Sequence, residues 1–203
     1  ESAVPMPEDP YGIAKFAVEM DLKTTHEMFG LNYVIFRPHN VYGEFQNIGD
    51  RYRNVVGIFM NQLMQGKSLS VFGDGGQTRA FSYIGDVAPY IAKSVHVKEA
   101  YNQVFNVGGD IEYTVKDLAL AVMEVMGMQS ELRYLPARNE VLHAFSDHSK
   151  VKTVFNIKDA DFTDLKTGLK RMADWVKVMG VKSTPMFKEI EIYEKLPAVW
   201  LEE

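Results

Sequence analysis

The sequence predicts an α/β protein in which short, parallel strands alternate with helices. Two observations predict this class. Short β-rich runs are followed by segments with helical periodicity, and Gly, Asn or Asp marks most of the joints between them. No internal repeat or low-complexity tract interrupts this order. Strands that alternate with helices in this way favour parallel pairing within one sheet.

The first helix has the clearest predicted boundaries. Asp9 is a favoured capping residue, and Pro10 suits the first helical position, where a backbone N–H would have no partner. Apolar residues then recur at helical spacing as far as Phe29, and Gly30 is a natural stop. The sequence therefore predicts a helix over residues 10–29.

The later elements follow from the same signals. Strands are predicted at residues 31–36, 69–72, 80–84, 103–107 and 132–135. Helices are predicted at residues 55–65, 86–97, 114–127, 149–155 and 164–179. Asp86 and Thr114 are the predicted caps of the helices that they open.

The composition excludes several classes of function. The 203 residues are 46% hydrophobic and 24% charged, which is ordinary for a soluble globular protein. A net charge of -5 argues against nucleic-acid binding, and no apolar run is long enough to span a membrane. With no cysteine there is no disulfide framework or thiolate site, which suits the cytoplasm. The five histidines show no ligand spacing, so no metal is assigned.

The chain lacks one expected part of a dinucleotide-binding fold. Such a fold begins with a strand, a G-x-G-x-x-G turn and a helix that receives the pyrophosphate. That pattern is absent, and the glycines at residues 73–76 lie between two predicted strands with no helix after them. The opening residues have no initiator methionine and have the composition of a loop. We therefore expect the chain to begin within a longer protein, with the pyrophosphate-binding half elsewhere.

Tyr11 and Lys15 form the main catalytic candidate. Their spacing of four places both side chains on one face of the first helix. Tyrosine is a poor base at neutral pH, but a lysine ammonium nearby stabilises its phenolate. Such a pair is suited to proton exchange with a hydroxyl during hydride transfer. An amphipathic helix with one surface lysine is the alternative interpretation of the same spacing.

Five ordered motifs resemble the extended short-chain dehydrogenase/reductase family. They are Pro-Tyr-Gly-Ile-Ala-Lys at residues 10–15, Phe-Arg-Pro-His-Asn-Val-Tyr-Gly at 36–43, the segment 72–87, Phe-Asn-Val-Gly-Gly at 105–109 and Asp-His-Ser-Lys at 147–150. The resemblance extends to about residue 180 and is greatest to the UDP-glucose 4-epimerase-like branch. It implies the carboxy-terminal part of a Rossmann-type parallel sheet, with a small mixed α/β substrate-binding domain.

The resemblance also implies a division into domains. Residues 1–39 and 80–108 would be the remnant of the NAD-binding domain, and residues 40–79 and 109–182 would bind the sugar nucleotide. Residues 183–203 would form a tail, to which no role is assigned.

By resemblance, NAD is the cofactor and a nucleotide-diphosphate sugar is the substrate. Tyr11 would be the acid/base, and Lys15 would hold the nicotinamide ribose. Pro38 and His39 would line the nicotinamide pocket, largely through their backbone. For Pro38, simple termination of a strand is an equal alternative.

The implied substrate residues are Asn40, Asn54, Ser70, Phe72, Arg79, Arg138 and Glu140. Arginine suits the diphosphate because its planar fork donates two parallel charged hydrogen bonds. The alternatives are an ordinary helix cap for Asn54, core packing for Phe72 and a solvated side chain for Arg79. The spacing around Arg138 is one residue off the family pattern, which weakens the assignment of Arg138 and Glu140.

The predicted function is NAD-dependent epimerisation of a UDP-sugar by transient oxidation of a sugar carbon. A nucleotide-sugar 4,6-dehydratase and a UDP-glucuronate decarboxylase are alternatives, because the residues that would separate them precede this chain in the family. A third alternative is an inert fragment that does not retain NAD. The resemblance implies a homodimer for the complete protein, with no nucleic-acid or membrane partner.

Overall fold

Parallel strand pairs organise the chain. The computed structural model describes residues 1–50, 54–138 and 141–183. Three two-stranded sheets in the described residues are parallel pairs: β1 (Val34–Pro38) with β6 (Gln103–Val107), β2 (Val41–Tyr42) with β5 (Ser82–Tyr83), and β3 (Leu69–Phe72) with β8 (Leu132–Leu135). These pairs confirm the predicted α/β class with parallel pairing.

A three-stranded mixed sheet is the fourth sheet of the described residues. β4 (Thr78–Ala80) lies between β7 (Glu112–Thr114), which is antiparallel to it, and β9 (His143–Ala144), which is parallel. The glycine-containing segment between β3 and β4 is a turn, as predicted, with no helix after it.

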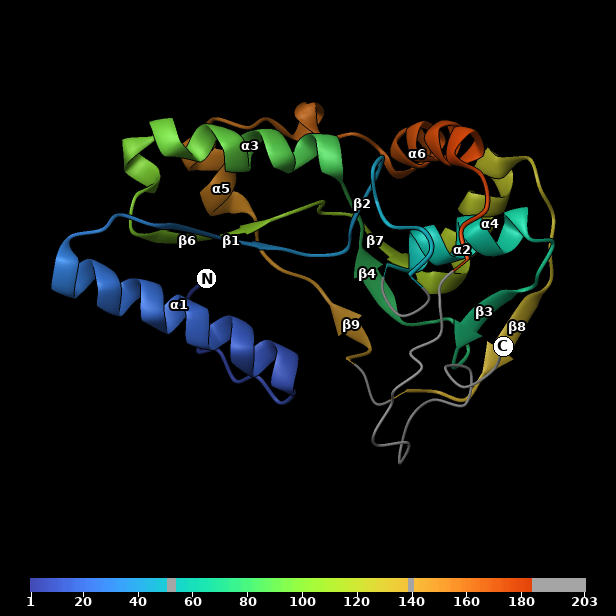
Figure 1. The fold of residues 1–203 in the computed structure, drawn as a ribbon, viewed down its shortest axis with the longest axis horizontal. Helices are drawn as coiled ribbons and strands as arrows, with labels where there is room; N and C mark the ends of the chain where they lie inside the picture. Colours follow the sequence, from blue (N-terminus) through green and yellow to red (C-terminus); the bar gives the residue numbers. More distant parts are fainter. Residues whose placement is uncertain (51–53, 139–140, 184–203) are drawn as a thin grey trace.

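Six α-helices lie around these strands in the described residues (Figure 1). They are α1 (Pro10–Phe29), α2 (Val55–Met64), α3 (Ala88–Lys93), α4 (Val115–Met126), α5 (Ser149–Phe155) and α6 (Leu165–Met179). Short 3-10 turns occur at Ile84–Asp86, Ser94–His96, Lys98–Ala100 and Asp159–Asp161. Every helix in this part of the chain is too short or too polar to cross a bilayer.

Local capping explains why several predicted boundaries are correct. The Asp9 carboxylate accepts a hydrogen bond of 2.8 Å from the Gly12 N–H, and Gly30 ends α1 in the left-handed region at φ 70°. The Thr114 hydroxyl likewise accepts from the N–H of Asp117 at the start of α4. These groups satisfy helix-end N–H donors that would otherwise lack partners.

Several predicted boundaries are wrong; for example, β1 ends at Pro38 rather than residue 36, and the predicted helix 86–97 is α3 at Ala88–Lys93 followed by a 3-10 turn. β1 begins at Val34 rather than Leu31, because the Leu31 carbonyl lies 3.1 Å from His26 Nδ1, outside any strand ladder. The predicted strand at residues 80–84 is divided into β4 and β5. Asp86 does not cap α3; its carboxylate accepts from the Thr163 N–H at 2.7 Å and hydroxyl at 2.9 Å.

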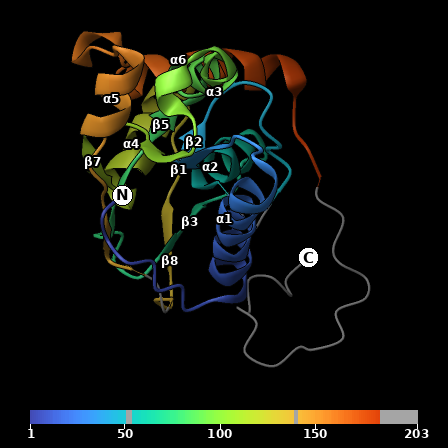
Figure 2. The ribbon, with the colours of Figure 1, turned by 90° about the vertical axis from the view of Figure 1, so that its left-hand side faces the viewer.

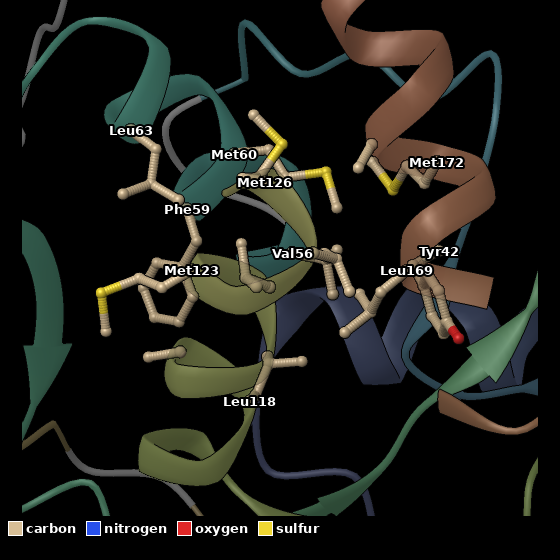
Figure 3. Packing of buried hydrophobic residues seen from close by; sticks show 14 of the residues in the cluster. Tyr42, Val56, Phe59, Met60, Leu63, Leu118, Met123, Met126, Leu169 and Met172 are labelled. Atoms are coloured by element: carbon tan, nitrogen blue, oxygen red, sulfur yellow. The ribbon is translucent and has the colours of Figure 1, made fainter. Parts of the chain in front are cut away.

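Two clusters of buried side chains form the core. In the larger one, α4 contacts both α2 and α6, and Figure 3 shows their apolar side chains pointing toward one another. The smaller cluster joins β6 to α5 through Phe105, Val107, Val151 and Phe155. The predicted domain division stays a prediction, although this cluster places α5 with the β1–β6 pair.

Helix α1 lies outside both clusters. It lies on one side of the β1–β6 pair, opposite α3 and α5 (Figures 1 and 2). None of its 20 residues is buried. A bidentate ion pair joins it to the sheet, with Arg37 Nε and Nη2 at 2.7 and 2.6 Å from the Glu19 carboxylate.

Candidate active site

A cavity of about 310 Å³ opens between α2, β3 and the turn that follows β1. Its polar lining carries two arginines together with amides and a hydroxyl, and no carboxylate from the described residues. These polar residues are Asn40, Asn54, Gln62, Ser70, Gln77, Arg79 and Arg138. Aromatic and aliphatic side chains form the rest of the wall, so the cavity suits an anionic ligand with an apolar portion.

The structure brings most of the predicted substrate residues to this one cavity. Six of them line it, although they are spread over almost 100 positions of the sequence: Asn40, Asn54, Ser70, Phe72, Arg79 and Arg138. Glu140 lies outside the described residues. The roles of the six in substrate binding stay predictions; what the structure establishes is their common location.

Two asparagines lie on the approach to the cavity in unusual backbone conformations. Asn40 has φ 47°, and its side-chain Nδ2 donates to the Ala80 carbonyl at 2.9 Å. Asn54 has φ 63°. It occupies the predicted cap position of α2, but its side chain makes no capping hydrogen bond there.

Ser70 is held by a neighbour that sequence reasoning missed. The Gln62 amide donates to the Ser70 hydroxyl at 3.1 Å and accepts from the Ser70 N–H at 3.3 Å. Directly before β4, Gln77 Nε2 donates to the Phe72 carbonyl at 3.1 Å. The sequence signal for Gln62 was its polar side chain directly before Leu63 and three positions after Phe59, both of which are buried in α2.

The cationic part of the wall consists of two arginines. The Arg138 guanidinium carbon lies 3.4 Å from the centre of the Phe72 ring, a stacked cation–π contact. Phe72 is half-buried at the cavity and is not a plain core residue. Arg79 Nη2 donates to the Val141 carbonyl at 2.6 Å, so this side chain is anchored rather than freely solvated.

Tyr11 and Lys15 lie together, as their spacing predicts, on the first turns of α1. The Lys15 ammonium is 5.4 Å from the centre of the Tyr11 ring. Tyr11 is 61% exposed, and neither residue lines the cavity. The start of α1 lies on the side toward which β1 runs (Figure 1), and the turn after β1 carries Asn40. The pair is therefore accessible to a ligand, but the described residues do not join it to the cavity.

Pro38 ends β1 and His39 follows it, and the two residues have different environments. Pro38 is exposed, whereas the ring of His39 stacks on His148 with centroids 4.9 Å apart. Burial, followed by the nearby His148, lowers the pKa of His39 to about 4. Sequence reasoning treated the histidines as scattered and missed this pairing, because 109 positions separate the two rings. Among the described residues, no group of three or more His, Cys, Asp or Glu is arranged to hold a metal ion.

Comparison with known proteins gives consistent results. A family model described as the NAD dependent epimerase/dehydratase family matches residues 1–108. A putative UDP-glucose 4-epimerase of Methanocaldococcus jannaschii is 33% identical over 172 residues, which cover 84% of this chain and 54% of that protein.

Two solved structures have a similar fold. A UDP-glucose 4-epimerase of Thermotoga maritima with UDP-glucose matches with TM-score 0.76 and 31% identity, over 87% of this chain and 56% of that one. A UDP-glucuronic acid 4-epimerase of Bacillus cereus with UDP-glucuronic acid and NAD matches with TM-score 0.79 and 27% identity, over 88% and 56%. The predicted fold class, a Rossmann-type sheet remnant with a smaller α/β part, is confirmed. The chain spans about half the length of the relatives that it matches.

Proposed function

Because this chain belongs to the NAD-dependent epimerase/dehydratase family, we propose that it forms the substrate-binding part of a UDP-sugar epimerase. In this proposal the cavity holds the nucleotide diphosphate, and Tyr11 and Lys15 serve the sugar hydroxyl. The activity is proposed for a protein that combines this chain with a pyrophosphate-binding turn, which the sequence itself does not contain.

The lining of the cavity is the observation that carries the proposal. Two arginines and several amide groups face it, without a carboxylate from the described residues, so its charge favours a diphosphate. Phe72 and the other apolar side chains of the lining supply an apolar wall against which a base can pack. A nucleoside diphosphate has these two properties in one molecule.

Tyr11 is the proposed proton carrier. Its phenolate would take the proton of a sugar hydroxyl as the hydride leaves, and the resulting phenol would return that proton when the sugar is reduced again. The Lys15 ammonium, 5.4 Å from the ring centre, would favour the phenolate form during this exchange. The exposure of Tyr11 supports this role because a sugar could reach the hydroxyl.

NAD, when bound, would supply the hydride acceptor for this chemistry. The described residues fit its nicotinamide end, since Tyr11 and Lys15 present a hydroxyl and an ammonium side by side on an accessible helix face. They do not fit its pyrophosphate, for which the sequence has no G-x-G-x-x-G turn. We therefore propose that the isolated chain does not retain NAD; stoichiometric NAD in the purified chain would contradict this.

UDP binding tests the cavity directly. Calorimetry on the 203-residue chain should show UDP binding more tightly than UMP or uridine. Arg138→Gln should weaken UDP binding about tenfold or more, because a charge-assisted hydrogen bond is typically worth about 1.5–3 kcal/mol. The matched control is Arg133→Gln on β8, a residue outside the cavity, which should leave the affinity within about twofold. Equal losses of UDP affinity in both variants, or no UDP binding at all, would refute the proposal.

Turnover tests the chemistry. A complete protein with this chain should epimerise a UDP-sugar, and Tyr11→Phe should lower kcat by about 10²–10⁴-fold, the usual contribution of a general acid/base. The relatives also include a decarboxylase and a dehydratase. Product analysis with UDP-glucose, UDP-N-acetylglucosamine, UDP-glucuronate and dTDP-glucose separates these activities. Normal turnover in Tyr11→Phe would exclude the proposed mechanism.

A further inference from the structure

A chain of polar side chains lies behind the turn that carries Asn40, outside the cavity lining. His148 is only 1% exposed, and its Nδ1 lies 2.7 Å from the Asp110 carboxylate. On the other side of the ring, Nε2 is 3.2 Å from the Ser146 hydroxyl, which is in turn 3.4 Å from His39 Nδ1. The four residues come from three different loops or helix starts, so the chain of hydrogen bonds joins segments that are distant in sequence.

The charge at one end gives this chain a direction. Burial raises the pKa of Asp110, but the hydrogen bonds from Lys152 and His148 together lower it by more, so the net shift of the pKa is downward. Asp110 is therefore a carboxylate that only accepts, which assigns a proton to His148 Nδ1. With its proton on Nδ1, the His148 ring can accept at Nε2 from the Ser146 hydroxyl, and the Ser146 oxygen can then accept from His39 Nδ1.

We propose that Asp110, His148 and Ser146 hold His39 in its Nδ1–H tautomer and thereby fix the turn that presents Asn40 to the cavity. His39 is in this view a positioning residue for nucleotide binding, and its role rests on the proposed function of the cavity.

The contacts of the turn support this role. The Ser82 hydroxyl donates to the His39 carbonyl at 3.0 Å, and the Ser82 N–H donates to the Asn40 carbonyl at 3.2 Å. Asn40 itself has φ 47°, in the left-handed region, which asparagine adopts more readily than other non-glycine residues. The His39 ring anchors the turn from its other side, through Ser146 and the stack on His148.

The second ring nitrogen of His39 supports the assigned tautomer. His39 Nε2 is buried and has no hydrogen-bond partner among the described residues. The adjacent Gly108 leaves little room, since a Cβ there would lie 3.0 Å from this nitrogen. Burial and the nearby His148 lower the pKa of His39 by more than Asp110 and the Gly109 backbone raise it, so the ring carries a single proton near neutral pH. A proton on Nε2 would be a buried donor without a partner, which is costly, whereas a proton on Nδ1 reaches Ser146.

Nitrogen NMR tests the tautomer on the 203-residue chain. With ¹⁵N-labelled histidine, His39 should show a protonated Nδ1 and an unprotonated Nε2 near neutral pH. Ser146→Ala should release that preference in His39, while His148 keeps the Nδ1 proton that it donates to Asp110. A proton on Nε2 of His39 in the wild-type chain would overturn the proposal, and so would an unchanged His39 spectrum in Ser146→Ala.

UDP affinity tests the positioning role with two matched variants. Asparagine places its amide near the position of Nδ1, and glutamine places its amide near that of Nε2. His39→Asn should therefore stay within about threefold of the wild-type affinity, and His39→Gln should lose about tenfold, the equivalent of one hydrogen bond of about 1.4 kcal/mol. Equal affinities in the two variants would overturn the positioning role.

The two measurements also separate this proposal from the proposed function. A wild-type chain that shows the assigned tautomer but binds no UDP would refute the nucleotide cavity and, with it, the positioning role. UDP binding with the opposite tautomer would refute only the hydrogen-bond chain. Should His39→Gln fail to fold, Ser146→Ala removes only a hydroxyl and should weaken UDP binding about tenfold in its place; unchanged UDP affinity in Ser146→Ala would then count against positioning.

Discussion

Helices α1 and α2 carry different parts of the proposed chemistry and are supported in different ways. α1 has 20 residues and buries none of them, whereas α2 has 10 residues and buries Val56, Gly57, Phe59, Met60, Asn61 and Leu63. The geometry of the cavity therefore depends on the core of the chain. The geometry of Tyr11 and Lys15 depends on one helical turn within α1.

The exposed side of α1 explains the difference. Six of its large apolar side chains are more than half exposed, whereas Phe16 and Leu22 are partly buried. The six are Tyr11, Ile13, Val18, Met20, Met28 and Phe29. A helix in a globular protein usually gains most of its stability from an apolar face packed on a core. In α1 the caps and the Arg37–Glu19 ion pair take a larger share. The comparison teaches that the cavity and the proton-exchanging pair need not have the same stability.

The largest effect expected from this difference is in core packing. Met60→Ala should lower the free energy of unfolding by about 2–5 kcal/mol, because Met60 is fully buried and its removal leaves a cavity. Met20→Ala on α1 removes the same atoms from a side chain that is 51% exposed and should change it by less than about 0.5 kcal/mol. Urea denaturation of both variants measures the two values; similar losses would show that α1 is packed as tightly as α2.

A second pair of variants compares a glycine of α6, a helix of the larger core cluster, with a glycine of α1, which lies outside both clusters. A Cβ at Gly168 in α6 would lie 2.3 Å from the Tyr42 hydroxyl, and Tyr42 is 2% exposed, so Gly168→Ala should destabilise by about 1–3 kcal/mol. At Gly12 in α1 the nearest atom is the Pro7 Cβ at 3.0 Å, in a segment outside both core clusters.

Gly12→Ala should therefore be stabilising by up to about 1 kcal/mol, the helix propensity difference between the two residues. Thermal unfolding of the two variants gives the signs. A loss at Gly12 comparable to that at Gly168 would mean that the segment before α1 is held rigidly.

The smallest expected effect concerns pH. The pKa of His39 in the folded chain is about 4, below its ordinary value of 6.5. Between these two pH values the unfolded chain binds a proton at this histidine and the folded chain does not. The free energy of unfolding should therefore fall from about pH 6.5 toward pH 4, by about 1–2 kcal/mol after allowance for the partial exposure of the ring. The lowered pKa of Asp110 acts in the same direction at lower pH, because its carboxylate must also be protonated.

The variant His39→Asn isolates the histidine part of this slope. It should show a weaker fall in stability between pH 6.5 and pH 4.5 than the wild type, measured by urea denaturation at each pH. Met20→Ala, which leaves His39, His148, Asp110 and Lys152 in place, serves as the control and should keep the wild-type slope. An unchanged slope in His39→Asn would contradict the prediction.

Sequence reasoning succeeded where the deciding interactions are local. Asp9 and Thr114 cap helices through hydrogen bonds to residues three positions away, and Gly30 ends α1 by its own backbone freedom. The proximity of Tyr11 and Lys15 follows from the helical repeat alone. Such contacts span a few residues, and residue type and spacing are enough to predict them.

It failed where a distant partner decides. Asp86 is a residue type that often caps helices, but its carboxylate accepts a hydrogen bond from the N–H of Thr163, 77 positions later. The predicted start of β1 at residue 31 failed partly for a related reason: besides the local contact of Leu31 with His26, the Tyr33 N–H donates to the side chain of Asn102. In both places a tertiary hydrogen bond replaced the local pattern that the sequence favours.

The sequence by itself determined the α/β alternation, most helix limits and the six described residues that could serve a nucleotide. Only the tertiary structure decided that these six line one cavity, that Gln62 fixes Ser70, and that His39 and His148 stack. The physical reason is that helix periodicity and capping act over a few residues. The positions of loops that lie far apart in sequence depend on how two cores pack, which no local spacing records.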